Sequence, residues 1–355
     1  MRGPVRRLPR AYAWPMSRGP TDPILRTDLA GIPLRNPVIL AAGTAGYLDE
    51  FQDALDLGKV GAAIGKSITA KPRDGHETWR IIESDAGMLN AVGLANMGVE
   101  AWSRDLAPTI APRAAAIGLL PFGSISGFSI DEYAEVARAM DAVEALPAIE
   151  INVSCPNVHT GSSFGETPDL LRDLVGTLRA AMTRTRMIVK ISPLVFGPLV
   201  EIARAAIEGR GVPGGPGNRP GADILCVSNT MPAMAIDVRT RRPRLSNVTG
   251  GLSGPAIHPI AVRLVHHVYT SVARDASVPI IGLGGVLKWQ HAAEFILAGA
   301  SAVGMGTALF VDPRSPIKVA RGLAKWAASQ GAANISELVG RVETSRVETT
   351  RAEGK

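Results

Sequence analysis

The sequence predicts an α/β protein that folds as a (β/α)8 TIM barrel with inserted loops over the C-terminal face. Eight short apolar runs recur along the chain, and amphipathic segments follow most of them. The runs are continuously apolar, a pattern typical of parallel strands that are covered by helices. Eight strand–helix units favour a closed barrel, with an open doubly wound sheet as the alternative.

The expected strands cover, in chain order, residues 38–42, 62–68, 119–125, 148–153, 187–191, 224–227, 279–282 and 302–305. Apolar residues three and four positions apart predict helices at residues 131–143, 168–182, 199–207, 259–273 and 289–298. Two of these helices carry start signals. Ser129 precedes a pair of acidic residues, and Pro168 occupies the first helical position.

Three segments depart from the repeat. Residues 211–221 are rich in glycine and proline and are expected to form a flexible surface insertion. Residues 231–255 are too long for an ordinary connection, so we expect them to cover or line a site. We therefore divide the chain into a basic, flexible arm (1–22), a barrel (23–335) and a polar C-terminal helix or tail (336–355).

Composition argues against several other classes. The 355 residues are 46% hydrophobic, enough for a large core, but they contain no apolar run long enough for a membrane-spanning helix. Part of the net charge of +6 comes from five arginines that precede Asp22, namely Arg2, Arg6, Arg7, Arg10 and Arg18. A solvated arm is favoured over a contact with nucleic acid or anionic lipid, because no basic helix with interleaved aromatic residues accompanies them. The same stretch weakly resembles a transit peptide, and Met16 is an alternative start.

The chain has two cysteines, Cys155 and Cys226, and nothing else typical of a secreted protein. We therefore expect a reducing, cytoplasmic location and no disulfide. No cysteine or histidine spacing typical of a metal site is present, so no metal is expected.

Polar, small or reactive residues gather where the expected strands end. Because the carboxyl ends of parallel barrel strands meet at one rim, these side chains are expected to form a site. The residues concerned are Ala42, Gly43, Thr44, Lys66, Ser67, Ser124, Asn152, Cys155, Lys190, Ser228, Asn229, Thr230, Gly284, Gly285, Gly306 and Thr307.

Two kinds of residue at this rim indicate an anionic ligand. The glycines after the last two strands allow backbone N–H groups to approach a phosphate, although glycine can also serve only to turn the chain. Lys66 and Lys190 lie within or at the end of apolar runs, where lysine is rare unless it is paired. Each lysine alone could equally extend to solvent or form a salt bridge.

Cys155 is the candidate reactive group. It lies in the stretch Asn152–Asn157, which follows an apolar strand and contains a proline. A free thiol is mostly protonated at neutral pH, but a nearby cation can make it a usable proton acceptor. Cys226, within an apolar run, is instead expected to pack in the core. Asn90 and Asn96, in a loop after the second strand, could orient a polar planar ligand or simply form turns.

Together these motifs resemble the dihydroorotate dehydrogenases of class 1, and among them the class 1B catalytic subunit most of all. A cysteine at position 155 separates this class from the membrane-associated class 2, which uses serine. The chain departs from frequent family residues at Ala42, Ser124 and His159. The matching stretches run in order through residues 36–44, 65–69, 89–96, 152–157, 165–168, 189–193, 229–230, 250–257, 279–285 and 304–307.

The resemblance implies FMN as cofactor and oxidation of (S)-dihydroorotate to orotate in pyrimidine (UMP) biosynthesis. Cys155 would take the C5 proton while hydride passes from C6 to flavin N5. Lys190 would stabilise the reduced flavin. The substrate residues implied are Lys66, Asn90, Ala91, Val92, Gly93, Leu94, Asn152, Asn229 and Thr230. The cofactor residues implied are Ala42, Gly43, Lys66, Ser67, Ser124, Asn152, Lys190, Ser228, Gly254, Gly284, Gly285, Gly306 and Thr307.

The same resemblance implies a homodimeric core and a separate iron–sulfur/FAD subunit that passes electrons to NAD. The electron acceptor is left open, because a class 1A enzyme would use fumarate at the same flavin. A dihydropyrimidine dehydrogenase-like reductase, whose substrate has no carboxylate, is a further alternative. The non-enzyme alternative is an inactive barrel that serves as a scaffold, and the presence of Cys155, Lys66 and Lys190 argues against it.

Overall fold

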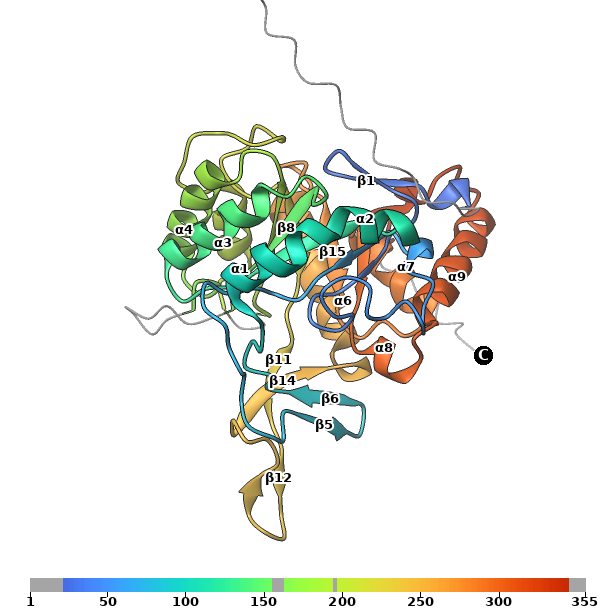
Figure 1. Ribbon diagram of the computed structural model, residues 1–355. Helices are drawn as coiled ribbons and strands as arrows, with labels where there is room; N and C mark the ends of the chain where they lie inside the picture. Colours follow the sequence, from blue (N-terminus) through green and yellow to red (C-terminus); the bar gives the residue numbers. More distant parts are fainter. Residues whose placement is uncertain (1–21, 155–162, 194–196, 345–355) are drawn as a thin grey trace, which may run out of the picture.

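A computed structural model describes residues 22–154, 163–193 and 197–344. Eight parallel strands in it pair in chain order, and the last strand pairs with the first (Figure 1). This closed barrel confirms the predicted fold and rules out the open sheet. Its strands are β3 (Val38–Leu40), β4 (Ala62–Ile64), β7 (Pro121–Ile125), β8 (Ala148–Asn152), β9 (Arg186–Ile191), β10 (Ile224–Val227), β15 (Ile280–Leu283) and β16 (Ala302–Met305).

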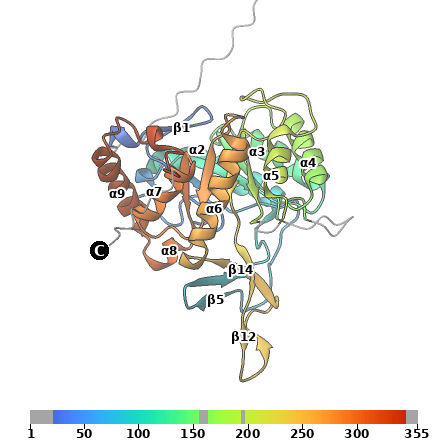
Figure 2. The ribbon, with the colours of Figure 1, turned by 180° about the vertical axis from the view of Figure 1, so that it is seen from behind.

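Helices surround the barrel on the outside, as the view from behind also shows (Figure 2). In α4, for example, Leu171, Leu174 and Leu178 form a buried stripe that faces the barrel, with proline in the first turn. The helices are α1 (Gly98–Ala101), α2 (Ala107–Ile117), α3 (Ile130–Asp141), α4 (Pro168–Ala181), α5 (Leu199–Glu208), α6 (His258–Val268), α7 (Trp289–Ala298), α8 (Ala308–Val311) and α9 (Ser315–Ser329).

The helices differ from the sequence predictions in three respects. No α-helix separates β3 from β4 in the described chain, where a short 3-10 turn lies at Leu57–Lys59. The helix expected at 259–273 begins at His258 and changes to π-helical geometry over Tyr269–Ala273. Helices α1, α2, α8 and α9 were not predicted, and α2 carries an internal proline, Pro112, a residue that usually breaks helices.

The barrel interior is apolar and is closed at its N-terminal end. A hairpin of β1 (Thr27–Leu29) and β2 (Ile32–Leu34) contributes to the same core cluster as the inward-facing strand residues. That cluster includes Leu29, Ile32, Leu34, Ile39, Ala62, Ile64, Phe122, Ala148, Ile188, Ile224, Cys226, Ile281 and Ala302. Cys226 therefore packs in the core as predicted, and the opposite end of the barrel is left for a site.

A second, antiparallel sheet extends beyond the C-terminal end of the barrel (Figure 1). It is built from the insertions after β4 and β10, which lie far apart in sequence and pair in the order β11-β14-β6-β5. Its strands are β5 (Ile81–Ser84), β6 (Gly87–Asn90), β11 (Met231–Met234) and β14 (Thr249–Ser253), and a small hairpin of β12 (Ile236–Asp237) and β13 (Arg242–Pro243) continues it. We call these six strands the extension.

The remaining segments lie on the surface. Within the Gly/Pro-rich stretch 211–221, Gly214 pairs with Arg219, and Arg219 donates to the carbonyls of Ala276 and Ser277. A 3-10 turn at Ile335–Leu338 follows α9. In the described parts of the chain, no helix is long and apolar enough to cross a membrane. The arm up to residue 21 and the tail from residue 345 lie outside the described residues.

Candidate active site

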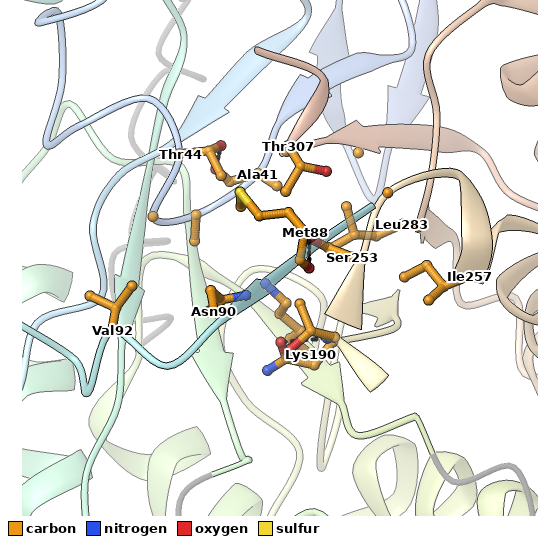
Figure 3. A pocket seen from close by; sticks show the side chains of 18 of the residues that line it. Ala41, Thr44, Met88, Asn90, Val92, Lys190, Ser253, Ile257, Leu283 and Thr307 are labelled. Atoms are coloured by element: carbon orange, nitrogen blue, oxygen red, sulfur yellow. Dashed lines mark hydrogen bonds between the residues drawn. The ribbon is translucent and has the colours of Figure 1, made fainter. Parts of the chain in front are cut away.

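A cavity of about 350 Å³ lies where the C-terminal ends of the barrel strands meet the extension (Figure 3). Among the described residues, every barrel strand except β7 contributes to the lining, either from its last residues or from the one or two residues that follow it. Residues from β5, β6 and β14 of the extension complete the wall. The expectation that segment 231–255 lines a site is therefore confirmed, through Ser253 and Gly254.

Most residues that the sequence places at the rim line this one cavity. Ser124 does not, because it is fully buried behind Ser67, with the two hydroxyl oxygens 2.8 Å apart. Cys155 falls outside the described residues. The lining includes Ala42, Gly43, Lys66, Ser67, Asn90, Ala91, Val92, Gly93, Leu94, Asn152, Lys190, Ser228, Asn229, Thr230, Gly254, Gly284, Gly285, Gly306 and Thr307.

Two lysine side chains lie at the cavity. Lys190, on β9, is 7% exposed, and its Nζ lies 3.5 Å from Oε1 of the buried Glu150 on β8. Burial acts to lower the pKa of Lys190, but the Glu150 carboxylate beside it acts in the opposite direction, and the pKa is raised. Lys66 follows β4, and burial together with repulsion from Lys190 lowers its pKa. The barrel strands thus hold positive charge at the cavity wall.

Three polar side chains form a network that joins the ends of β8 and β10, across the intervening β9. Asn229 Nδ2 donates to Asn152 Oδ1 at 3.1 Å and to Ser154 Oγ at 2.9 Å. Its Oδ1 accepts from the backbone N–H of Thr230 at 2.8 Å. These bonds fix the orientation of both amides before any ligand arrives. They leave amide groups at the cavity wall that suit a planar ligand with its own donors and acceptors.

Asn90 reaches the cavity from the extension. Its Nδ2 donates to the carbonyl of Gly251, the residue paired with it across β6 and β14. Figure 3 shows Asn90 and Lys190 on one side of the cavity, with Thr44 and Thr307 on another. The extension therefore positions part of the site and does not merely cover it.

A corner of backbone glycines lies after β15 and β14. Gly285 has φ +69°, and a Cβ there would lie 2.6 Å from the Gly254 carbonyl oxygen, so no larger residue fits. Gly254 likewise has φ +95° and would bring a Cβ within 2.7 Å of Gly87. Such close backbone packing without side chains leaves N–H groups able to approach an anion.

His258, at the first turn of α6, supports this corner and was missed by the sequence reasoning. Its Nδ1 lies 2.9 Å from the Gly284 carbonyl oxygen, and its Nε2 lies 2.5 Å from the Glu294 carboxylate. The imidazole ring thus bridges the backbone of the glycine corner and the Glu294 side chain on α7. The usable signal in sequence is its place directly after the matching stretch 250–257.

Other lining residues were also missed, among them Met88, Ser253, Ile257, Leu283 and Phe310. Ser253 pairs with Met88 across β14 and β6, so their meeting depends on a contact between segments far apart in the chain. Strand periodicity within one segment does not carry that information.

The fold and the site define a (β/α)8-barrel protein with a cationic, glycine-cornered cavity at the active-site end of the barrel. Comparison with known proteins specifies the family. The dihydroorotate dehydrogenase family model matches residues 24–326. A Trichlorobacter lovleyi protein named dihydroorotate dehydrogenase B (NAD(+)), catalytic subunit, is 44% identical over 322 residues, which cover 90% of this chain and 99% of that protein.

Two further relatives extend the comparison. A Desulforudis audaxviator protein of the same name is 44% identical over 88% of this chain and 95% of its own length. A Solibacter usitatus protein, provisionally named dihydroorotate dehydrogenase A (fumarate), is 41% identical over 90% of this chain and 98% of its own length. The chain belongs to the dihydroorotate dehydrogenase family and is an oxidoreductase of the class 1B-like group. Enzymes of this family act in pyrimidine biosynthesis and typically bind FMN.

Proposed function

We propose that this chain is the catalytic subunit of a class 1B dihydroorotate dehydrogenase, which oxidises (S)-dihydroorotate to orotate with FMN. One observation carries the proposal: two lysines, an oriented amide network and a glycine corner line one cavity. These are the groups that a flavin phosphate, a reducible ring and an anionic planar substrate require. Cys155 is the base in this proposal.

The residues present fit FMN. At the glycine corner, the backbone N–H groups of Gly284, Gly285 and Gly306 would hold the phosphate, and a Cβ at Gly285 would close that space. Lys66 and Lys190 would face the ring system. When bound, FMN supplies the two-electron acceptor of the reaction. The positive charge of Lys190 is already in place where negative charge develops on reduction, so it needs no rearrangement.

The substrate would lie between the lysines and the amides. Lys66 supplies charge for the substrate carboxylate, and Asn90, Asn152 and Asn229 supply donors and acceptors for the ring. Because the network holds Asn229 and Asn152 in fixed orientations, the ring is held in one pose. A fixed pose is what proton and hydride removal from adjacent carbons requires.

Cys155 would accept the C5 proton. An unperturbed thiol has a pKa of about 8.5, and a neighbouring cation lowers it. Ser154, the residue before it in the chain, accepts a hydrogen bond from Asn229 and so belongs to the amide network. The proposal therefore assigns the base to the same rim as the amides that hold the substrate.

We further propose that electrons leave through a separate iron–sulfur/FAD subunit to NAD. The names of the relatives, which denote a catalytic subunit of an NAD enzyme, support this. So does an apolar surface beside the cavity, where Phe310 lines the cavity and is 55% exposed and Val311 is 77% exposed. A homodimeric core and a cytoplasmic location complete the proposal.

The second candidate is a class 1A enzyme that reduces fumarate, and the Solibacter relative favours it. An acceptor panel separates the two. With dihydroorotate as donor, the class 1B proposal expects NAD reduction only when the partner subunit is added, and no oxidation of dihydroorotate by fumarate. Fumarate-dependent turnover by the chain alone would assign it to class 1A instead.

Flavin content is the first test of the proposed cofactor. Protein purified from cells, or refolded with FMN, should be yellow and should release about one FMN per chain on denaturation, because one cavity holds the whole cofactor. A folded, colourless protein that does not take up FMN contradicts the proposal. FAD in place of FMN would contradict it as well.

A further inference from the structure

A buried carboxylate lies directly beneath the candidate active site. Glu150 is the middle residue of β8 and is 1% exposed. Side chains alternate between the two faces of a strand, so Ala148, Glu150 and Asn152 share the inner face of the barrel. Ala148 belongs to the apolar barrel core, whereas Asn152 lines the cavity. Glu150 therefore lies at the boundary between the core and the site.

The charge of Glu150 is compensated from the next strand. Its Oε1 lies 3.5 Å from Nζ of Lys190, and the two side chains are 1% and 9% exposed. Among the described residues, neither carboxylate oxygen has a hydrogen-bond partner. A pair this deeply buried loses much of its attraction to desolvation, and apolar side chains of similar volume would often stabilise the fold as well or better. Stability alone is therefore a poor explanation for this pair.

The two lysines of the cavity have pKa values shifted in opposite directions. Burial and repulsion from Lys190 lower the pKa of Lys66, and no carboxylate among the described residues lies within ion-pair distance of it. Lys190 is buried more deeply, yet its pKa is raised, because Glu150 lies beside it. The Glu150 carboxylate therefore distinguishes the surroundings of Lys190 from those of Lys66.

We propose that Glu150 is a positioning residue for the cofactor site, which holds the Lys190 ammonium in place at the cavity floor and keeps it charged. The proposal rests on the proposed function, because the charge on Lys190 matters there for the flavin. Glu150 touches neither ligand and acts through Lys190. The pair thus presents one fixed positive charge to the ring while the compensating negative charge stays below, away from the cavity.

Cys226 offers a matched control. It lies on β10, on the other side of Lys190 from Glu150, and is paired with Lys190 in the strand register. Burial and the nearby Glu150 raise the pKa of its thiol, so it is neutral. Cys226→Ala therefore removes a buried neighbour of Lys190 without removing a charge, whereas Glu150→Gln removes the charge and keeps the shape.

The first experiment uses apoprotein, so it does not depend on the flavin. Lysines carrying 13C at Cε are titrated by NMR, and the signals of Lys190 and Lys66 are assigned from Lys190→Met and Lys66→Met. In the unaltered protein and in Cys226→Ala, Lys190 should titrate above ordinary lysine. In Glu150→Gln its pKa should fall by at least about one unit, a tenfold change in proton affinity, to below ordinary lysine. The pKa of Lys66 should rise at the same time, because its charged neighbour is lost.

The second experiment measures the midpoint potential of bound FMN at about pH 9, where a lysine of ordinary pKa, about 10.4, is still charged. If Lys190 is neutral in Glu150→Gln, the reduced flavin loses a nearby cation and the potential falls. A tenfold loss of affinity for the reduced flavin relative to the oxidised flavin lowers the potential by about 30 mV for a two-electron couple. If Lys190 stayed charged, removal of the carboxylate would raise the potential instead.

Unchanged titration of Lys190 in Glu150→Gln overturns the proposal, and so does a raised potential at a pH where the titration shows that Lys190 has lost its proton. If that variant does not fold, Glu150→Asp serves in its place, since it keeps the charge but withdraws it by one methylene. In Glu150→Asp the pKa of Lys190 should fall by less than about one unit. An unchanged pKa in that variant would also overturn the proposal. Failure to bind FMN at all would instead refute the proposed function and leave the apoprotein titration valid.

Discussion

At the residue scale, the chemistry of the site depends on lysines in apolar surroundings, and the sequence already indicated them. Lys66 and Lys190 stood out because each lies in or beside an apolar strand. Their opposite environments could not be predicted, because Glu150 is only one polar residue in a buried strand until its distance from Lys190 is known. Ser124 shows the converse limit, since it belongs to a rim strand but is buried and hydrogen-bonded to Ser67, which the sequence pattern did not indicate.

Lys66 should give ligand binding a pH dependence. Its pKa is lowered, so it loses its proton at a lower pH than free lysine, and the affinity for an anionic ligand should weaken as pH rises through that lowered pKa. Orotate binding to the oxidised holoenzyme measures this without turnover. In Lys66→Arg, which stays charged throughout, the Lys66-dependent part of the weakening should be absent. Identical pH profiles for the two proteins would rule out Lys66 as the titrating group.

At the element scale, the strands and five of the helices followed from periodicity, whereas the extension did not. The insertion 231–255 was recognisable by its length, but its pairing with β6 joins segments that lie far apart in the chain. Local pattern predicts that such a segment exists and not where its partner lies. Asn90 and Gly254 were expected at the site from the family resemblance, whose matching stretches do not include Met88.

The glycine corner gives a test at this scale. Gly285→Ala places a Cβ 2.6 Å from the Gly254 carbonyl oxygen at φ +69°, so the corner must move and FMN affinity should fall by about tenfold or more, a loss of about 1.4 kcal/mol. Gly331→Ala is the matched control, because Gly331 has φ +71° with nothing within 4 Å of the added Cβ. Each substitution carries backbone strain of about 1–3 kcal/mol.

Titration of apoprotein with FMN, followed by flavin fluorescence, measures the affinity of each variant, and thermal unfolding measures the stability of each. Gly331→Ala should lose stability and keep its affinity for FMN. If Gly285→Ala bound FMN as tightly as Gly331→Ala does, the phosphate would have to be held elsewhere in the cavity.

At the scale of the whole molecule, the barrel was predictable because eight buried parallel strands leave few other ways to close a sheet. Once the barrel closes, its geometry alone brings residues at the ends of β3, β4, β8, β9, β10, β15 and β16 to one rim. The site could therefore be predicted as a set of residues from a one-dimensional pattern. The helices could not all be predicted in the same way. The described chain has no α-helix between β3 and β4, because closure of the barrel depends on its strands and not on every helix.

The most direct test of the account is anaerobic reduction of the flavin-loaded protein by dihydroorotate. The flavin absorbance should bleach, and one orotate should form for each flavin reduced. Cys155→Ala should keep its flavin but bleach about 10²–10⁴-fold more slowly near neutral pH, because a positioned base contributes that much. A flavin that stays oxidised in the presence of dihydroorotate, or a Cys155→Ala variant as fast as the unaltered protein, would contradict the account.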